Sequence, residues 1–311
     1  MEIRVDSEVV RLLTILDPHV CPVGPESRLD DYWDSCKKSF AQILGFSIKN
    51  KVSAVVVGGD MFHRKSPAKN PVWFLRELIR VLREFEDNGI PVIGIAGNHD
   101  LVWGSITSLE RQPIGILQAA GVYHLLDEDP VVLKGNGFEV RVVGRSYGVD
   151  AVSALLQEKK GAEDYLVGVG HFWYGPKSGD FYGEKVWGPD ELEKSEIDVF
   201  VIGHHHADQG IQLVNEKYYV VHGSMSQTGV HAHDITRKPS VGLVEFIKEK
   251  VARVAVVRLK VSPVEQIFDL EKQKKVVEEK RILDDFLKNL ASDFKIGSWG
   301  EYYRDNKCNY C

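Results

Sequence analysis

The sequence predicts an α/β fold in which two mixed β-sheets form a sandwich flanked by helices. Three observations support this prediction: short apolar runs that each end in a polar residue or glycine, helical stretches between these runs, and a later region that is mostly strand. With 311 residues, the chain is long enough to bury a full core without disulfides or a structural metal.

Five runs are predicted to be strands. Each is mostly apolar, which is typical of strands that are covered on both faces. They are RLLTIL before Asp17, VSAVVV before Gly58, PVIGIA before Gly97, YLVGVG before His171 and VFVI before Gly203.

The segments between and after these runs predict helices and hairpins. Residues 28–50 and 70–88 carry apolar side chains at three- and four-residue intervals, which predicts two amphipathic helices. Asn136-Gly137 separates two strand-like pieces and predicts a hairpin turn, and LVNEKYYVV predicts a second hairpin. Residues 209–260 are predicted to be mostly strand.

The last fifty residues differ from the rest of the chain. We expect residues 1–260 to form the main domain and residues 261–311 to form a helical C-terminal appendage with an aromatic, cysteine-containing tail. An apolar stripe within residues 264–294 predicts an amphipathic helix, which either docks on a partner or packs on the protein's own sheet. Cys308 and Cys311 supply only two of the four ligands of a structural zinc site, so a reduced tail is expected, with a site shared between two chains as the alternative.

The composition is that of an ordinary globular protein, with 43% hydrophobic and 27% charged residues. No apolar run approaches the roughly 18 residues of a membrane span, and the first residues do not resemble a signal peptide. Together with the four scattered cysteines, these features predict a cytoplasmic, intracellular protein that does not bind a membrane. The net charge of −6 argues against nucleic-acid binding by bulk electrostatics, although a local site is still allowed.

Side chains with metal-binding atoms follow all five predicted strands. In open α/β sheets, the loops after the carboxyl ends of the strands share one crevice. These side chains offer oxygen or neutral nitrogen atoms, which suit Mn²⁺, Fe²⁺ or Zn²⁺, and they are too many for one ion. We therefore expect two divalent ions about 3.5 to 4 Å apart. The residues are Asp17, His19, Asp60, Asn98, His99, Asp100, His171, His204, His205 and His206.

Each of these groups alone has an ordinary structural explanation. A single buried histidine such as His171 is more often a hydrogen-bonded core residue, GGD often forms a turn, and Asn-His-Asp can cap a helix. Their joint occurrence after five strands in succession is what favours a functional metal site.

At these residues the sequence resembles the calcineurin-like metallophosphoesterases. The motifs DPH, GD, GNHD, GH and GHHH fill every ligand position of that pattern, and the resemblance spans residues 12 to about 225. It implies the metallophosphoesterase sandwich fold and a metal-dependent phosphodiesterase. It further implies that His205 points away and that Asp60 bridges two metals, one held with Asp17, His19 and His206 and the other with Asn98, His171 and His204.

Within that superfamily, the stretch GGDMFHRK is most similar to the SbcD-type DNA repair nucleases, with His63 as the extra marker. This resemblance implies a Mn-dependent DNA exonuclease and endonuclease acting in repair, recombination or replication, with Fe or Zn as alternative ions. It implies DNA as the substrate and an SbcC-type coiled-coil ATPase as the partner of the C-terminal helix, and it is compatible with a homodimer. Pro18 in the first motif and the short segment after the core depart from the pattern.

The same motifs suggest catalytic roles. His99 is the candidate to stabilise the transition state or to protonate the leaving oxygen, and Asp100 is expected to orient it through a hydrogen bond. His63 is expected to act at the centre because the motif includes it. Arg64 and Lys65 either hold a nucleic-acid backbone or form the solvated start of the next helix.

Two other functions stay open on sequence grounds. A phosphodiesterase or phosphatase for small nucleotides or other phosphoesters would use the same centre, and the negative net charge favours it. An inactive scaffold of the same fold is less favoured, because such proteins usually lack ligands or the catalytic histidine. The aromatic residues of HFWYG, at 171–175, suggest base stacking, although core packing is expected for at least two of them.

Overall fold

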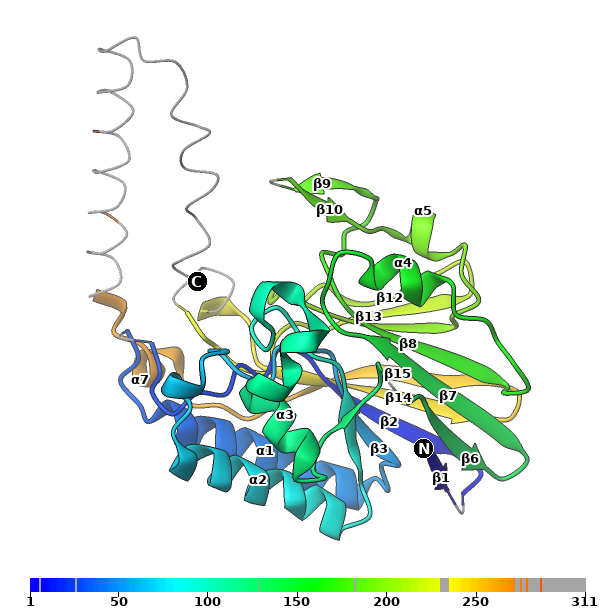
Figure 1. Cartoon of the computed structure of the whole chain (residues 1–311), viewed down its shortest axis with the longest axis horizontal. Helices are drawn as coiled ribbons and strands as arrows, with labels where there is room; N and C mark the ends of the chain where they lie inside the picture. Colours follow the sequence, from blue (N-terminus) through cyan, green and yellow to red (C-terminus); the bar gives the residue numbers. More distant parts are fainter. Residues whose placement is uncertain are drawn as a thin grey trace.

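The computed structural model describes residues 1–271 except 6, 26, 128, 182 and 230–234, together with the single residues 275, 278 and 286. Two large mixed sheets pack face to face, and helices cover both outer faces (Figure 1). This arrangement confirms the predicted fold class.

One sheet carries three of the five predicted metal-site strands. In the described part of the chain it has six strands, and β2, β3, β4 and β5 run parallel to one another, whereas β14 pairs with β2 in the antiparallel direction. Its order is β15 (Lys250–Arg258), β14 (Ser240–Ile247), β2 (Val10–Ile15), β3 (Ala54–Val57), β4 (Val92–Gly94) and β5 (His124–Leu125).

The other sheet carries the remaining two. Both predicted hairpins lie in it: the Asn136-Gly137 turn joins β6 to β7, and Asn215 and Glu216, both with positive φ, join β12 to β13. Its order among the described residues is β1 (Glu2–Arg4), β6 (Val131–Gly135), β7 (Phe138–Arg145), β8 (Tyr165–His171), β11 (Val199–Gly203), β13 (Lys217–Val221) and β12 (Gly210–Val214).

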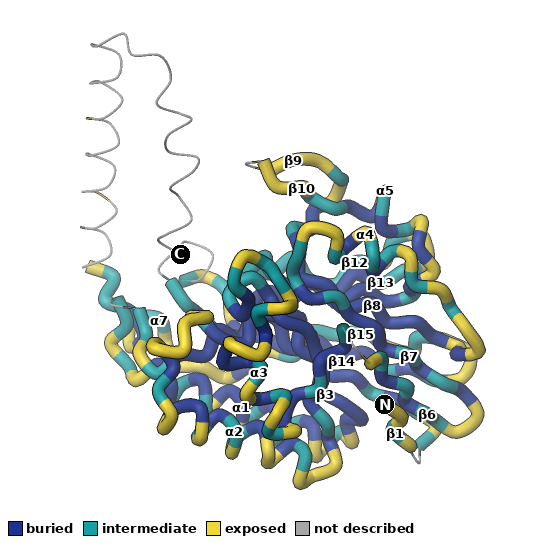
Figure 2. Tube along the Cα trace, viewed as in Figure 1, coloured by how far each residue is buried: buried dark blue, intermediate teal, exposed yellow. Residues whose placement is uncertain are grey.

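The near-continuous apolar strands supply three layers of core. Along β2, for example, Leu12 packs between the two sheets and Leu13 packs against the helices on the outer face. Figure 2 shows that the strands of both sheets are largely buried. The outer layers are α1 (Tyr32–Lys49), α2 (Val72–Asp87) and α3 (Pro113–Ala119) on one side, and α4 (Ala151–Leu156) and α5 (Pro189–Leu192) on the other.

The two predicted amphipathic helices are present, and local chemistry sets where they begin. The side chain of Asp31 caps α1 by accepting a hydrogen bond of 2.9 Å from the backbone N–H of Asp34. Pro71 precedes α2, where the fixed φ of proline suits a helix start. Short 3₁₀ turns lie at Pro67–Lys69, Val102–Gly104 and Ile106–Arg111.

Past β8, the chain forms a small hairpin that the sequence did not predict, made of β9 (Gly179–Phe181) and β10 (Glu184–Val186). Near the C-terminus, α7 (Val264–Ile267) ends at Phe268, whose backbone is extended. The predicted helix over 264–294 is therefore interrupted at Phe268, whose side chain is buried.

The rest of that predicted helix falls mostly outside the described residues, as do Cys308 and Cys311. The domain boundary at residue 260 stays a prediction. In the described part of the chain, every helix is too short or too polar to cross a membrane.

Candidate metal centre

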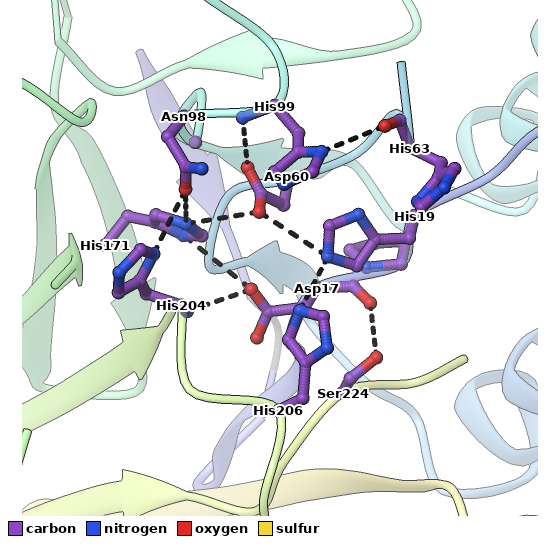
Figure 3. A network of polar contacts seen from close by, with 12 residues as sticks. Asp17, His19, Asp60, His63, Asn98, His99, His171, His204, His206 and Ser224 are labelled. Atoms are coloured by element: carbon purple, nitrogen blue, oxygen red, sulfur yellow. Dashed lines mark hydrogen bonds and ion pairs between the residues drawn. The ribbon is translucent and has the colours of Figure 1, made fainter. Parts of the chain in front are cut away.

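The candidate ligands meet at one end of the sandwich, where strands of both sheets end. Asp17 and His19 follow β2, and Asp60 follows β3, in one sheet, while His171 ends β8 in the other. Figure 3 shows these side chains and those after β4 and β11 pointing toward one another. The ends of strands from both sheets therefore bring the candidate ligands together.

The first group of ligand atoms is tightly clustered. Single atoms of Asp17, His19, Asp60 and His206 all lie within 4.8 Å of one another. The Nε2 atoms of His19 and His206 are 2.8 Å apart, and Nε2 of His19 is 3.5 Å from Oδ2 of Asp60. This donor set matches the first metal position implied by the resemblance.

The second group is arranged around the side-chain oxygen of Asn98. Oδ1 of Asn98 lies 3.0 Å from Nε2 of His171 and 3.0 Å from Nδ1 of His204. Nε2 of His171 also lies 3.4 Å from Oδ2 of Asp60. The same carboxylate oxygen thus faces both groups, which is the position a bridging ligand would need.

The hydrogen bonds around His171 show that this group suits a cation. Nδ1 of His171 is 2.8 Å from the backbone oxygen of Gly58 and donates to it, so the neutral ring keeps a lone pair on Nε2. That lone pair faces oxygens of Asn98 and Asp60. In the other group, Oδ2 of Asp17 is buried without a hydrogen-bond partner among the described residues. A bound divalent ion would compensate such a convergence of electron-rich atoms.

Charge crowding shifts the pKa values of the buried acids and histidines. Burial, with the help of neighbouring Asp60, raises the pKa of Asp17 to about 7. Burial would also raise the pKa of Asp60, but His171 and His19 outweigh it and hold that pKa well below its usual range. Burial alone would lower the pKa of His171, whereas Asp60 and Asp17 raise it to about 9.

The backbone is strained where it presents these side chains. Asp17, His19, Asp60 and His204 all have positive φ, at 45°, 45°, 50° and 95°. For residues with a Cβ atom, this conformation costs about 1 kcal/mol or more each. Gly97 explains part of the close packing, because a Cβ atom at Gly97 would collide with the Asp60 carboxylate. The surrounding fold therefore stabilises a geometry that the loops would not adopt alone.

A loop after β13 braces the first motif. Oγ of Ser224 donates a hydrogen bond of 2.7 Å to the backbone oxygen of Asp17, and Oγ of Ser226 donates one of 2.6 Å to that of Pro18. The guanidinium of Arg237 donates to the backbone oxygens of Ser224 and Ser226. The resemblance over residues 12 to about 225 included Ser224, but no sequence motif pointed to Ser226 or Arg237.

His99 and His63 lie beside the first group. Their rings stack with centroids 5.9 Å apart, and the ring of His99 is 4.8 Å from that of His19. Nδ1 of His99 donates to the backbone oxygen of His63 at 2.9 Å, which leaves Nε2 of His99 for other chemistry. Burial and the neighbouring His99 lower the pKa of His63 to about 4.

Asp100 does not make the hydrogen bond that the sequence suggested. The expected acceptor for His99 is replaced by the backbone oxygen of His63, and the Asp100 carboxylate turns into the protein. There it accepts backbone N–H groups of Phe62, Met61 and Gly97 at 2.9, 3.0 and 2.9 Å. Adjacency in sequence was misleading, because three unpaired N–H groups attract the carboxylate more strongly than a neighbouring imidazole. Asp100 is thus a positioning residue that joins the loops after β3 and β4.

We expect Asp100→Ala to destabilise the fold by roughly 3 kcal/mol or more, because it leaves three buried N–H groups without an acceptor. Thermal or urea unfolding of the metal-free chain measures this difference. Asp150→Ala, at an exposed aspartate whose side chain does not cap α4, is the matched control and should change stability little. Equal stability of the two variants would contradict this role for Asp100.

The remaining sequence candidates lie around the rim. The side chains of Arg64 and Lys65 are exposed, and Nζ of Lys65 lies 3.4 Å from the backbone oxygen of Asn98. His205, expected to point away, contacts Nε2 of Gln209 at 2.7 Å through its Nδ1 atom. Arg64 makes no direct contact with the candidate ligands among the interactions described.

Two aromatic side chains lie beside His204 in the second group. In HFWYG, Phe172 and Tyr174 are buried in the core, as expected for two of the three, whereas Trp173 is only partly buried. The Trp173 ring lies 4.8 Å from that of His204, and Tyr147 stacks on His204 at 5.8 Å. Tyr147 could not be found from the sequence, because no motif precedes it.

Three proteins are similar in sequence to parts of this chain. DNA double-strand break repair protein Mre11 of Halobacterium salinarum is 23% identical over 253 residues, covering 78% of this chain and 57% of the relative. The Saccharolobus solfataricus protein of the same name is 30% identical over 158 residues, covering 47% and 38%. Double-strand break repair protein MRE11 of Encephalitozoon cuniculi is 34% identical over 124 residues, covering 32% and 20%.

The chain spans little more than half the length of the Halobacterium relative. A family model described as calcineurin-like phosphoesterase matches residues 11–208. The match runs from the first predicted metal-site strand to just past His206, and it covers more than half of the chain. From this match, which agrees with the fold and with the cluster at the strand ends, we conclude that the chain belongs to the calcineurin-like phosphoesterase family.

Proposed function

We propose that this chain is a two-metal phosphodiesterase that cleaves DNA as an exonuclease and endonuclease, with Mn²⁺ as its preferred ion and Fe²⁺ or Zn²⁺ as alternatives. The observation that carries the proposal is the position of Asp60, whose Oδ2 atom faces His19 at 3.5 Å and His171 at 3.4 Å. In this proposal, Asp17, His19, Asp60 and His206 hold one ion. Asp60, Asn98, His171 and His204 hold the other.

The chain's own residues orient and protonate the substrate in this proposal. Two bound divalent ions would acidify a water molecule and neutralise the charge that develops on the phosphate oxygens. His99 is proposed to hold a proton on Nε2 and pass it to the leaving oxygen, because its Nδ1 already donates to His63. Arg64 and Lys65, exposed at the rim, are proposed to contact backbone phosphates.

The relatives named above support DNA as the substrate class, since each is described as a double-strand break repair protein. We propose by the same analogy that the chain acts in DNA repair inside the cell. Residues 264–294 would dock on a coiled-coil ATPase of the SbcC type, and a homodimer is compatible with this assembly. Residues 1–260 would form the nuclease domain and residues 261–311 the appendage.

Incubation of the purified chain with end-labelled single-stranded and duplex DNA tests the substrate class. With Mn²⁺, we expect release of nucleotides from the ends and internal cuts, both abolished by a chelator. Hydrolysis of bis-p-nitrophenyl phosphate should follow the same metal dependence. If no phosphodiester is cleaved with Mn²⁺, Fe²⁺ or Zn²⁺ at any pH, the proposed activity is wrong and the inactive-scaffold alternative stands.

A second function is favoured by one observation, the net charge of −6, which repels the DNA backbone. This alternative is a phosphodiesterase or phosphatase acting on small nucleotides or other phosphoesters at the same centre. Rapid cleavage of small phosphodiesters together with intact DNA in the assay above would select it.

A further inference from the structure

The hairpin β9–β10 is firmly attached beside the second group of candidate ligands. At its base, the backbone N–H of Trp187 donates to the oxygen of Trp173 at 2.9 Å, and that of Gly175 donates to Trp187 at 3.1 Å. Asp190 at the start of α5 accepts the backbone N–H of Ser178 at 2.9 Å. These contacts hold the hairpin in place although its own strands are exposed.

Glu184, the first residue of β10, extends from this hairpin toward His204. Its Oε2 atom accepts a hydrogen bond of 2.8 Å from Nε1 of Trp173 and lies 3.8 Å from Nε2 of His204. Nε2 of His204 is buried and lacks a hydrogen-bond partner among the described residues. The Glu184 side chain is about half exposed, so a small rotation brings its carboxylate into hydrogen-bond range of that nitrogen.

The two nitrogens of His204 face different surroundings, and the proton can sit on only one of them in the neutral ring. Nδ1 lies 3.0 Å from Oδ1 of Asn98, inside the candidate centre. A proton on Nδ1 would be donated to Asn98 and would block metal binding there. A proton on Nε2 instead leaves the Nδ1 lone pair directed at the centre, beside the oxygen of Asn98.

We infer that Glu184 is a positioning residue for the second metal: it accepts the Nε2 proton of His204 and so keeps the Nδ1 lone pair available as a ligand. Such carboxylate–histidine–metal arrangements fix the ring orientation and the tautomer of metal-binding histidines. The inference rests on the metal site of the proposed function and names a residue outside the motifs.

Titration of the metal-free full chain with Mn²⁺, followed by calorimetry, tests this role without any turnover. The wild-type chain should bind two ions. Glu184→Ala should weaken one of the two binding steps by about 10- to 100-fold and leave the other unchanged. Glu184→Gln should recover most of that loss, because the amide oxygen still accepts the proton of Nε2.

The matched control is Glu191→Gln. Glu191 lies in α5 and pairs with Lys185 of the hairpin, not with His204. The control variant should bind both ions as the wild type does, and circular dichroism checks that each variant is folded. Wild-type binding by Glu184→Ala, equal weakening of both steps, or the same loss in Glu191→Gln would each overturn the inference. A wild-type chain that binds no Mn²⁺ would instead count against the proposed function itself.

Discussion

Asp60→Asn should bind neither ion firmly and should lose at least about 10³-fold in phosphodiesterase activity, because one oxygen of Asp60 faces both candidate ligand groups. In the structure, the backbone N–H of His99 donates to Oδ1 of Asp60 at 2.8 Å. Asparagine keeps the volume of the side chain and an oxygen that can still accept this hydrogen bond. The fold should therefore survive. Activity on bis-p-nitrophenyl phosphate and the metal content after dialysis measure the two effects.

Thermal unfolding provides an independent measurement for Asp60→Asn. An ion that binds only the folded chain stabilises it by about 2.7 kcal/mol at a concentration 100 times its Kd, so Mn²⁺ should raise the Tm of the wild type. It should leave the Tm of Asp60→Asn nearly unchanged. Asp87→Asn, at the exposed end of α2, is the control and should respond as the wild type does. A full Tm gain in Asp60→Asn would show that Asp60 is not a shared ligand.

His99→Ala has the second-largest expected effect, and it should separate catalysis from metal binding. Its ring lies beside His19 but is not in either ligand group of the proposal, so Mn²⁺ binding should stay within a few-fold of wild type. Loss of a positioned general acid typically lowers kcat by about 10²- to 10⁴-fold. Calorimetry with Mn²⁺ and steady-state kinetics on DNA or a small phosphodiester measure the two quantities.

Leaving-group chemistry sharpens the interpretation of His99→Ala. A substrate with a p-nitrophenolate leaving group needs little protonation, so the variant should lose less activity on it than on DNA. His124→Ala is the control. It removes a histidine of β5 that follows α3 in the chain and is not a candidate ligand, so the variant should keep full activity. Wild-type kcat on DNA in His99→Ala would remove this residue from the proton transfer.

Much of the fold was predictable because the strands that build the site are buried on both faces. Each of the five apolar runs is a strand, since an alternation of polar residues would be costly in a layer that packs on both sides. The Asn136-Gly137 turn was equally predictable, because positive φ at Gly137 is a local property of the sequence. These features depend on near neighbours along the chain.

The features that escaped prediction depend on contacts between distant segments. Asp100 was assigned to the adjacent His99, but two of the three N–H groups that it satisfies belong to a loop about forty residues earlier. Strands of three residues among glycines and aromatics, as in β9–β10, leave no alternating pattern to detect. Glu184 could not be linked to His204 from sequence, because only the docked hairpin brings the two together.

The wide spacing of the candidate ligands has a consequence for the newly made chain. His19 and His206 are 187 positions apart, yet their Nε2 atoms end 2.8 Å from each other. At a translation rate of about 5 to 20 residues per second, synthesis of the segment between His19 and His206 takes roughly 10 to 40 seconds. The ligand set of the proposed ions would therefore be complete only late in biogenesis, after both sheets have docked.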